Sequence, residues 1–147
     1  MAVDVLTEIT IRCARAAVAD YAADPENATV WYENIESVQW KTDPPLRVGS
    51  EIEFAARFRG RRLAYTYRVI EFLPNERLVM STSGGPFPME TTYAWSSLGE
   101  TSTRMMLRNR GGAQALMRVF GPLEALAVRR ANRKDLARLR SILEGSA

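Results

Sequence analysis

Residues 111–144, GGAQALMRVFGPLEALAVRRANRKDLARLRSILE, decide the fold, because they form the longest run of helix-forming residues in the chain. After the opening glycine pair, only one break interrupts this stretch, at Gly121-Pro122. Proline removes a backbone N–H donor and clashes with the preceding helical turn. The sequence therefore predicts a short helix over 113–120 and a long helix that starts at Pro122.

The apolar residues of this stretch form two sets on different helical faces. The first set follows an i, i+3, i+4, i+7 spacing and contains Leu116, Val119, Phe120, Leu123, Ala127 and Ala131. The second set contains Val128, Leu136, Leu139, Ile142 and Leu143. At about 100° per residue, the second face is rotated from the first by roughly 150°. We therefore predict a kink at Pro122 or a helix that is covered on two sides.

Two short helices are predicted directly after a first strand. Residues 3–11 alternate between apolar and polar side chains, which indicates a half-buried strand. Residues 13–23 follow with small side chains and indicate a short helix. In Asp24-Pro25-Glu26 the aspartate can cap a helix that has proline at its first position and an acid in its first turn. A second short helix is therefore expected from Pro25 to about Tyr32.

Further strands are predicted where side chains alternate between turn residues, at 35–40, 51–58, 61–73, 77–83, 87–98 and 101–110. They follow one another as hairpins, apolar on one face and charged on the other, which is typical of an antiparallel sheet with one face in water. Such a sheet has to cover its apolar face, and the C-terminal helix is the only predicted element long enough to do so. The pattern predicts an α+β fold in which residues 1–147 form one domain.

The composition is that of an ordinary globular protein, with 147 residues, 46% of them hydrophobic and 25% charged. We do not expect the first residues to act as a signal peptide, because they already alternate and carry Asp4 and Glu8. No apolar run approaches the roughly 18 residues that span a bilayer. Cys13 is the only cysteine, which excludes an internal disulfide and a cysteine metal cluster. We therefore expect a cytoplasmic protein without a transmembrane segment.

The net charge of +3 is unevenly distributed along the chain. Residues 101–147 carry ten basic and three acidic side chains, so the C-terminal helix is strongly basic. A basic helix can attract nucleic acid or an anionic membrane. No aromatic residues are interleaved with the arginines of 129–140, which favours a solvated helix face over a nucleic-acid-binding surface.

Several local segments and the order of the elements resemble a known superfamily. The segments are 23–27 followed by Trp31, the pair Val48-Gly49, the hairpin 67–74 and the ending 136–140. With them the chain resembles the START-like, birch-pollen-allergen-like helix-grip superfamily (SRPBCC), in particular its bacterial polyketide cyclase/dehydrase and lipid-transport branch. The resemblance implies a curved antiparallel sheet of about seven strands wrapped around the long C-terminal helix. It also implies a ligand cavity between the sheet and that helix.

The resemblance and the strand alternation together imply which residues line this cavity. They are Phe54, Phe58, Tyr65, Tyr67, Met80, Tyr93, Trp95, Met105 and Leu107. Asn132 shares the helical arc of Val128 and Leu136, so it can point inward or lie at the cavity rim. A pocket rich in aromatic and methionine side chains suits a largely apolar ligand. The alternative is that these side chains simply fill the core.

Catalytic groups are hard to find in this sequence. The chain has no histidine, and the strand carboxylates Glu51, Glu53 and Glu90 fall on the outward face. Tyrosines in the predicted lining could polarise a carbonyl or could be structural, with hydrogen-bonded hydroxyl groups. No metal-ligand spacing, phosphate-binding glycine loop or nucleophile elbow is present, so we assign no catalytic residue, metal or cofactor.

The leading hypothesis is a domain that binds a small hydrophobic molecule, lipid-like or polyketide-like, without an identifiable reaction. One alternative is an enzyme of the aromatic polyketide cyclase or dehydratase type. A second alternative is an interaction module that uses the basic C-terminal helix to contact a partner.

Overall fold

Seven strands form one antiparallel sheet in the computed structural model, which describes residues 2–58, 60–84, 88–112 and 124–145. The strands are β1 (Ala2–Ile11), β2 (Ile35–Trp40), β3 (Glu51–Phe58), β4 (Arg61–Leu73), β5 (Arg77–Gly84), β6 (Met89–Gly99) and β7 (Ser102–Gly112). The helices are α1 (Arg15–Ala23), the 3₁₀ turn η1 (Pro25–Asn27), α2 (Ala28–Trp31) and α4 (Glu124–Gly145). This is the helix-grip architecture that the element order predicted.

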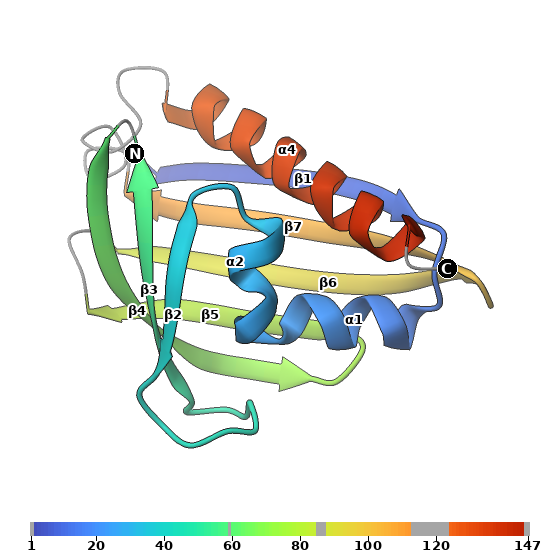
Figure 1. Cartoon of the computed structure of the whole chain (residues 1–147), viewed down its shortest axis with the longest axis horizontal. Coiled ribbons are helices and arrows are strands. Elements are labelled where there is room, and N and C mark those ends of the chain that lie inside the picture. The colour runs from blue at the N-terminus through green and yellow to red at the C-terminus, as the bar shows by residue number, and fades with distance from the viewer. Residues whose placement is uncertain (1, 59, 85–87, 113–123, 146–147) are drawn as a thin grey trace.

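The first strand pairs with the last, which hairpin succession alone does not predict. The sheet order is β1-β7-β6-β5-β4-β3-β2, so β1 and β2 lie at opposite edges although they are close in sequence. The register of β1 and β7 runs from Ala2 opposite Gly112 to Ile11 opposite Thr103. The segment α1–η1–α2 therefore crosses the concave face of the sheet to connect its two edges (Figure 1).

The sheet curves strongly, and its irregular pairings explain why. Register shifts interrupt the β4–β5 pairing between Thr66 and Tyr67 and between Val69 and Glu71, and β2–β3 has another near Ile35. An extra residue in one strand bends it and increases its twist. In Figure 1, β2, β3 and β4 accordingly turn across the direction of β1, β7 and β6. The curved sheet forms a concave face that encloses α2 and α4.

The helical corner begins at the predicted residue. The Asp24 carboxylate accepts a hydrogen bond from the backbone N–H of Glu26 at 3.0 Å, and Pro25 follows at the first position of the turn. The first turn is a 3₁₀ helix, and the α-helical turn starts only at Ala28. The Asn27 side-chain amide donates to the Tyr21 carbonyl at 3.0 Å, which ties this corner to α1.

Helix α4 packs against β1 through its inward face, as Figure 1 shows. Its buried residues are Val128, Asn132, Asp135, Leu136 and Leu139. The predicted helix over 113–120 and the kink at Pro122 lie outside the described residues.

The opposite face of α4 presents basic side chains to solvent, at Arg130, Arg133, Arg138 and Arg140. A partner for this face stays a prediction. Among the described residues, no helix combines the length and apolar character needed to span a membrane.

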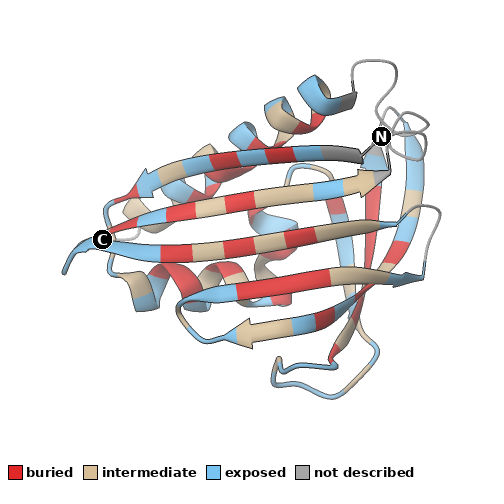
Figure 2. Ribbon diagram, turned by 180° about the vertical axis from the view of Figure 1, so that it is seen from behind, coloured by how far each residue is buried: buried red, intermediate tan, exposed pale blue. Residues whose placement is uncertain are grey.

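Burial along the strands follows the predicted period of two. Buried and more accessible residues alternate along β1, β7 and β6 in Figure 2. The outward face carries exposed ion pairs, such as Arg108 with Asp4 and Arg110 with Glu90. Exposed pairs of this kind contribute only about 0–1 kcal/mol each. The stability of the fold therefore comes from the apolar face that the helices cover.

We expect Leu139→Ala to lower the free energy of unfolding by about 2–5 kcal/mol, because the leucine is fully buried and its removal leaves a cavity. Leu126→Ala on the same helix is the matched control, because Leu126 is 55% exposed. The control should change stability by no more than about 0.5 kcal/mol. Urea denaturation measures both variants. Equal midpoints for the two variants would contradict the packing of α4.

Candidate functional site

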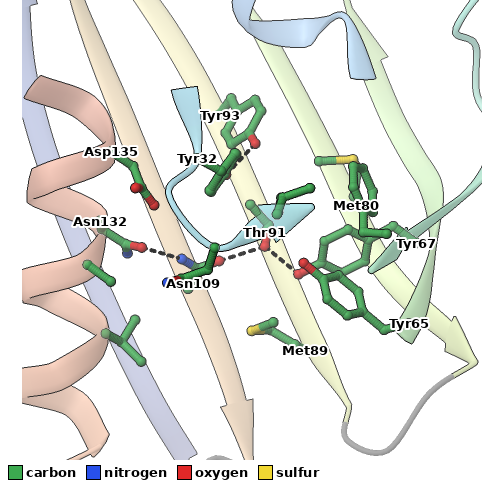
Figure 3. Close-up of a pocket in the computed structure, with 15 residues that line it drawn as sticks. Tyr32, Tyr65, Tyr67, Met80, Met89, Thr91, Tyr93, Asn109, Asn132 and Asp135 are labelled. Carbon is green, nitrogen blue, oxygen red and sulfur yellow. Dashed lines mark hydrogen bonds between the residues drawn. The ribbon is translucent and has the colours of Figure 1, made fainter. Parts of the chain in front are cut away.

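A cavity lies between the concave face of the sheet and α4 (Figure 3). The cavity volume is about 80 Å³, and the atom-free space is about 660 Å³ when the part open to solvent is included. A single water requires only about 10–15 Å³ of cavity volume, so the cavity has room for more than one water. The lining residues are Tyr32, Asn34, Ile35, Phe54, Tyr65, Tyr67, Met80, Met89, Thr91, Tyr93, Asn109, Val128, Ala131, Asn132 and Asp135.

The structure separates the residues expected to line the cavity into two groups. Those that border it are Phe54, Tyr65, Tyr67, Met80, Tyr93 and Asn132. Trp95, Met105 and Leu107 are buried in the packed core and do not border it. The side chain of Phe58 lies outside the described part of the structure. Strand parity correctly indicates the inward direction, but it does not indicate where along a strand the core ends and the cavity begins.

Several lining residues have sequence signals that the expected list did not use. Asn109 continues the inward parity of Met105 and Leu107 on β7, and Thr91 shares the parity of Tyr93 on β6. Asp135 lies three residues after Asn132 and therefore on the same side of the helix. By contrast, Tyr32, Asn34 and Ile35 come from the α2–β2 corner, where no periodic pattern predicts their direction.

Aromatic rings form the wall opposite the helix. Phe54 stacks on Tyr65 with ring centroids 5.8 Å apart, and Tyr67 meets both rings edge-on at 5.9 Å and 5.4 Å. These three residues come from neighbouring strands, because Phe54 on β3 lies directly opposite Tyr65 on β4. Edge-to-face and offset arrangements are the favourable ones for aromatic pairs. This wall is therefore largely apolar and made of rings in favourable mutual contact.

A chain of hydrogen bonds crosses the cavity from this wall to α4 (Figure 3). The hydroxyl groups of Tyr67 and Thr91 are 2.6 Å apart, and Thr91 donates to Asn109 Oδ1 at 2.6 Å. Asn109 Nδ2 donates in turn to Asn132 Oδ1 at 3.1 Å. The Asn132 Nδ2 group is buried and has no hydrogen-bond partner in the described structure. The chain therefore ends at a donor without a partner, in a residue that lines the cavity.

The sequence matches the family model described as polyketide cyclase / dehydrase and lipid transport over residues 2–144. The chain belongs to this family. A search of curated proteins found no match.

Solved structures with low sequence identity share the fold. The Zhui aromatase/cyclase from Streptomyces sp. R1128 is 14% identical, with 98% of this chain and 94% of that chain covered and a TM-score of 0.79. A START superfamily protein from Mycobacterium smegmatis is 16% identical, with coverage of 97% and 95% and a TM-score of 0.73. Major latex-like protein 151 from Panax ginseng is 10% identical, with 97% of both chains covered and a TM-score of 0.74. At these identities the likeness concerns the fold alone.

In this polyketide cyclase/dehydrase family member, the corner after α2 closes one side of the cavity. The hydroxyl groups of Tyr32 and Tyr93 are 2.5 Å apart, which joins the corner to β6. The Asp135 carboxylate accepts the backbone N–H of Glu33 at 3.1 Å, which joins the same corner to α4. Two hydrogen bonds thus hold the corner against both the sheet and the helix.

The environment changes the ionisation of the groups in the cavity. Burial raises the pKa of Asp135 from its ordinary 3.8 to about 7, and the Glu33 N–H only partly opposes this. Burial also raises the pKa of Tyr67 and Tyr93 well above the ordinary value of 10. The tyrosine hydroxyl groups are therefore neutral at physiological pH. The Asp135 carboxyl group, by contrast, ionises near neutral pH. Among the described residues, no group of His, Cys, Asp and Glu side chains could hold a metal ion.

Asp135 should make the stability of the fold depend on pH. Between pH 3.8 and about 7 the unfolded chain loses this proton while the folded protein keeps it, so stability falls as pH rises. The slope is at most about 1.4 kcal/mol per pH unit. Asp135→Asn retains an oxygen acceptor for Glu33 but removes this titration.

Urea denaturation at pH 5 and pH 8 tests this expectation. The Asp135→Asn variant should gain stability relative to the wild type when the pH is raised from 5 to 8. A stability difference that is the same at both pH values would contradict the assigned environment of Asp135.

Proposed function

We propose that this protein binds a small, largely hydrophobic molecule in the cavity between the sheet and α4. The observation that carries the proposal is the unpartnered Nδ2 group of Asn132, a residue that lines the aromatic-walled cavity. A buried donor without a partner costs about 1–3 kcal/mol. A ligand that accepts a hydrogen bond from this amide recovers that cost, while its apolar body covers the aromatic wall.

The side chains that line the cavity suit a small, largely apolar ligand. Aromatic rings and the two methionines Met80 and Met89 supply apolar contact surface, and methionine adapts to irregular shapes. Ala131 is the smallest lining side chain and leaves space at the helix. Family membership and the fold of the similar structures are consistent with binding of a hydrophobic molecule.

A second candidate is an enzyme of the cyclase or dehydratase type that acts on a polyketide-like substrate. Asp135 favours it, because a carboxyl group with a pKa of about 7 can take up and release a proton near neutral pH. The neutral Tyr32–Tyr93 hydroxyl pair borders the same cavity and could donate a hydrogen bond to a substrate carbonyl. The similarity to the Zhui aromatase/cyclase agrees with this candidate at the level of the fold.

The two candidates differ in the expected effect of Asp135→Asn. A binding protein should retain its affinity for an apolar ligand in this variant and should show no turnover of a poly-β-ketone substrate. An enzyme should turn that substrate over as wild type and lose most of the rate in the variant, with little change in binding.

Filling the cavity from the helix should abolish ligand uptake. Ala131→Leu adds a larger side chain at a residue that lines the cavity, so it should prevent binding of the uncharged fluorescent probe N-phenyl-1-naphthylamine. Ala127→Leu is the matched control, because Ala127 is also half-buried on α4 but does not border the cavity. Fluorescence titration at equal folded fraction measures both variants. If the wild type takes up no probe, or if both variants bind it equally well, the proposed site is wrong.

A further inference from the structure

The hydrogen bonds that link Tyr67, Thr91, Asn109 and Asn132 all run in one direction from donor to acceptor. A threonine hydroxyl has one proton, and Thr91 uses it to donate to Asn109, so Tyr67 must be the donor in its bond to Thr91. Asn109 then donates to Asn132, and every bond in the chain points from the sheet to the helix. The donor that this chain leaves without a partner is Asn132 Nδ2, in a residue that is only 4% exposed.

The cavity offers no positive charge to an anionic ligand. None of its described lining residues is a lysine, arginine or histidine, although the outer face of α4 carries several arginines. The ionisable carboxyl group in the lining is Asp135, which lies one helical turn from Asn132. A carboxylate in this cavity would lose its hydration without gaining a counter-charge, and it would lie near a second carboxyl group. Burying an unpaired charge is far more costly than burying a hydrogen-bonded neutral group.

We infer that the cavity selects uncharged ligands that present a hydrogen-bond acceptor, such as a ketone, ester or amide carbonyl, to Asn132, and that it discriminates against carboxylates such as free fatty acids. This inference rests on the proposed binding function and specifies the ligand class. In this arrangement the carbonyl oxygen accepts from Asn132 Nδ2, and the apolar part of the ligand lies against the wall formed by Phe54 and Tyr65.

Three naphthalene probes of similar size test the inference. They are 2-acetylnaphthalene, which has a carbonyl acceptor, 2-isopropylnaphthalene, which has none, and 2-naphthoate, which is ionised at pH 8. Their dissociation constants are measured at pH 8 by displacement of N-phenyl-1-naphthylamine. In the wild type, we expect 2-naphthoate to bind at least about tenfold more weakly than the ketone. This comparison requires no variant and therefore does not depend on how a variant folds.

The variant Asn132→Leu tests the role of the amide directly. The ratio of the isopropyl and ketone dissociation constants should fall by roughly two- to tenfold in this variant, which corresponds to the loss of one hydrogen bond. Met89→Leu is the control, because Met89 lines the same cavity without a polar hydrogen-bonding group. The same ratio should be unchanged in the control, even if both probes bind more weakly.

The outcomes separate this inference from the proposed function. Equal binding of the ketone and the carboxylate by the wild type would overturn the inference while leaving the binding function intact. An unchanged ratio in Asn132→Leu would also overturn it. If neither N-phenyl-1-naphthylamine nor any of the three naphthalenes binds, the proposed function itself fails, and the inference fails with it.

Discussion

The packing of α4 against the concave face of the sheet is the constraint on which the rest of the structure depends. In the second half of the helix, Leu136 and Leu139 are completely enclosed and belong to the same core cluster as Met105 and Leu107. In the first half, Val128, Ala131 and Asn132 border the cavity instead. One helix therefore performs two tasks: Leu136 and Leu139 seal the core, and Val128, Ala131, Asn132 and Asp135 form one wall of the proposed site.

This division also explains the position of the polar groups. Tyr67, Thr91, Asn109 and Asn132 form a hydrogen-bonded chain that spans from the sheet to the helix beside apolar walls. Buried polar groups are normally satisfied, because an unsatisfied one is costly. The chain meets this requirement at each residue until the Asn132 Nδ2 group, which has no partner in the described structure. The place where the polar chain is incomplete is thus the place where the proposed ligand binds.

Most of the fold could be predicted from the sequence because local patterns encode it. The alternation of Tyr65, Tyr67 and Val69 gives the inward face of β4, and Asp24-Pro25 gives the start of the second helical segment. The pairing of β1 with β7 could not be read in this way, because it joins residues about a hundred positions apart. The resemblance to a known family implied a curved sheet of about seven strands, and the structure adds which strands pair at its edge.

The candidate site was less predictable, because a cavity depends on where packing stops. Trp95 and Tyr93 have the same parity on β6, yet Trp95 is in the core and Tyr93 borders the cavity. Tyr32 reaches the cavity from a corner that has no regular period. Asp135 lies on the same helical face as Asn132, but its sequence context hides its role in the lining. An aspartate on a basic helix is usually interpreted as a surface residue.

The most direct test of the binding site is an NMR titration of protein labelled with ¹³C at the methionine methyl groups. Met80 and Met89 line the cavity, Met105 lies in the core, and Met106 borders a hollow on the outer face of the sheet. When 2-acetylnaphthalene is added, its ring current should shift the methyl signals of Met80 and Met89 in a saturable manner and leave that of Met106 unchanged. A saturable shift of Met106 without shifts of Met80 and Met89 would contradict binding between the sheet and α4.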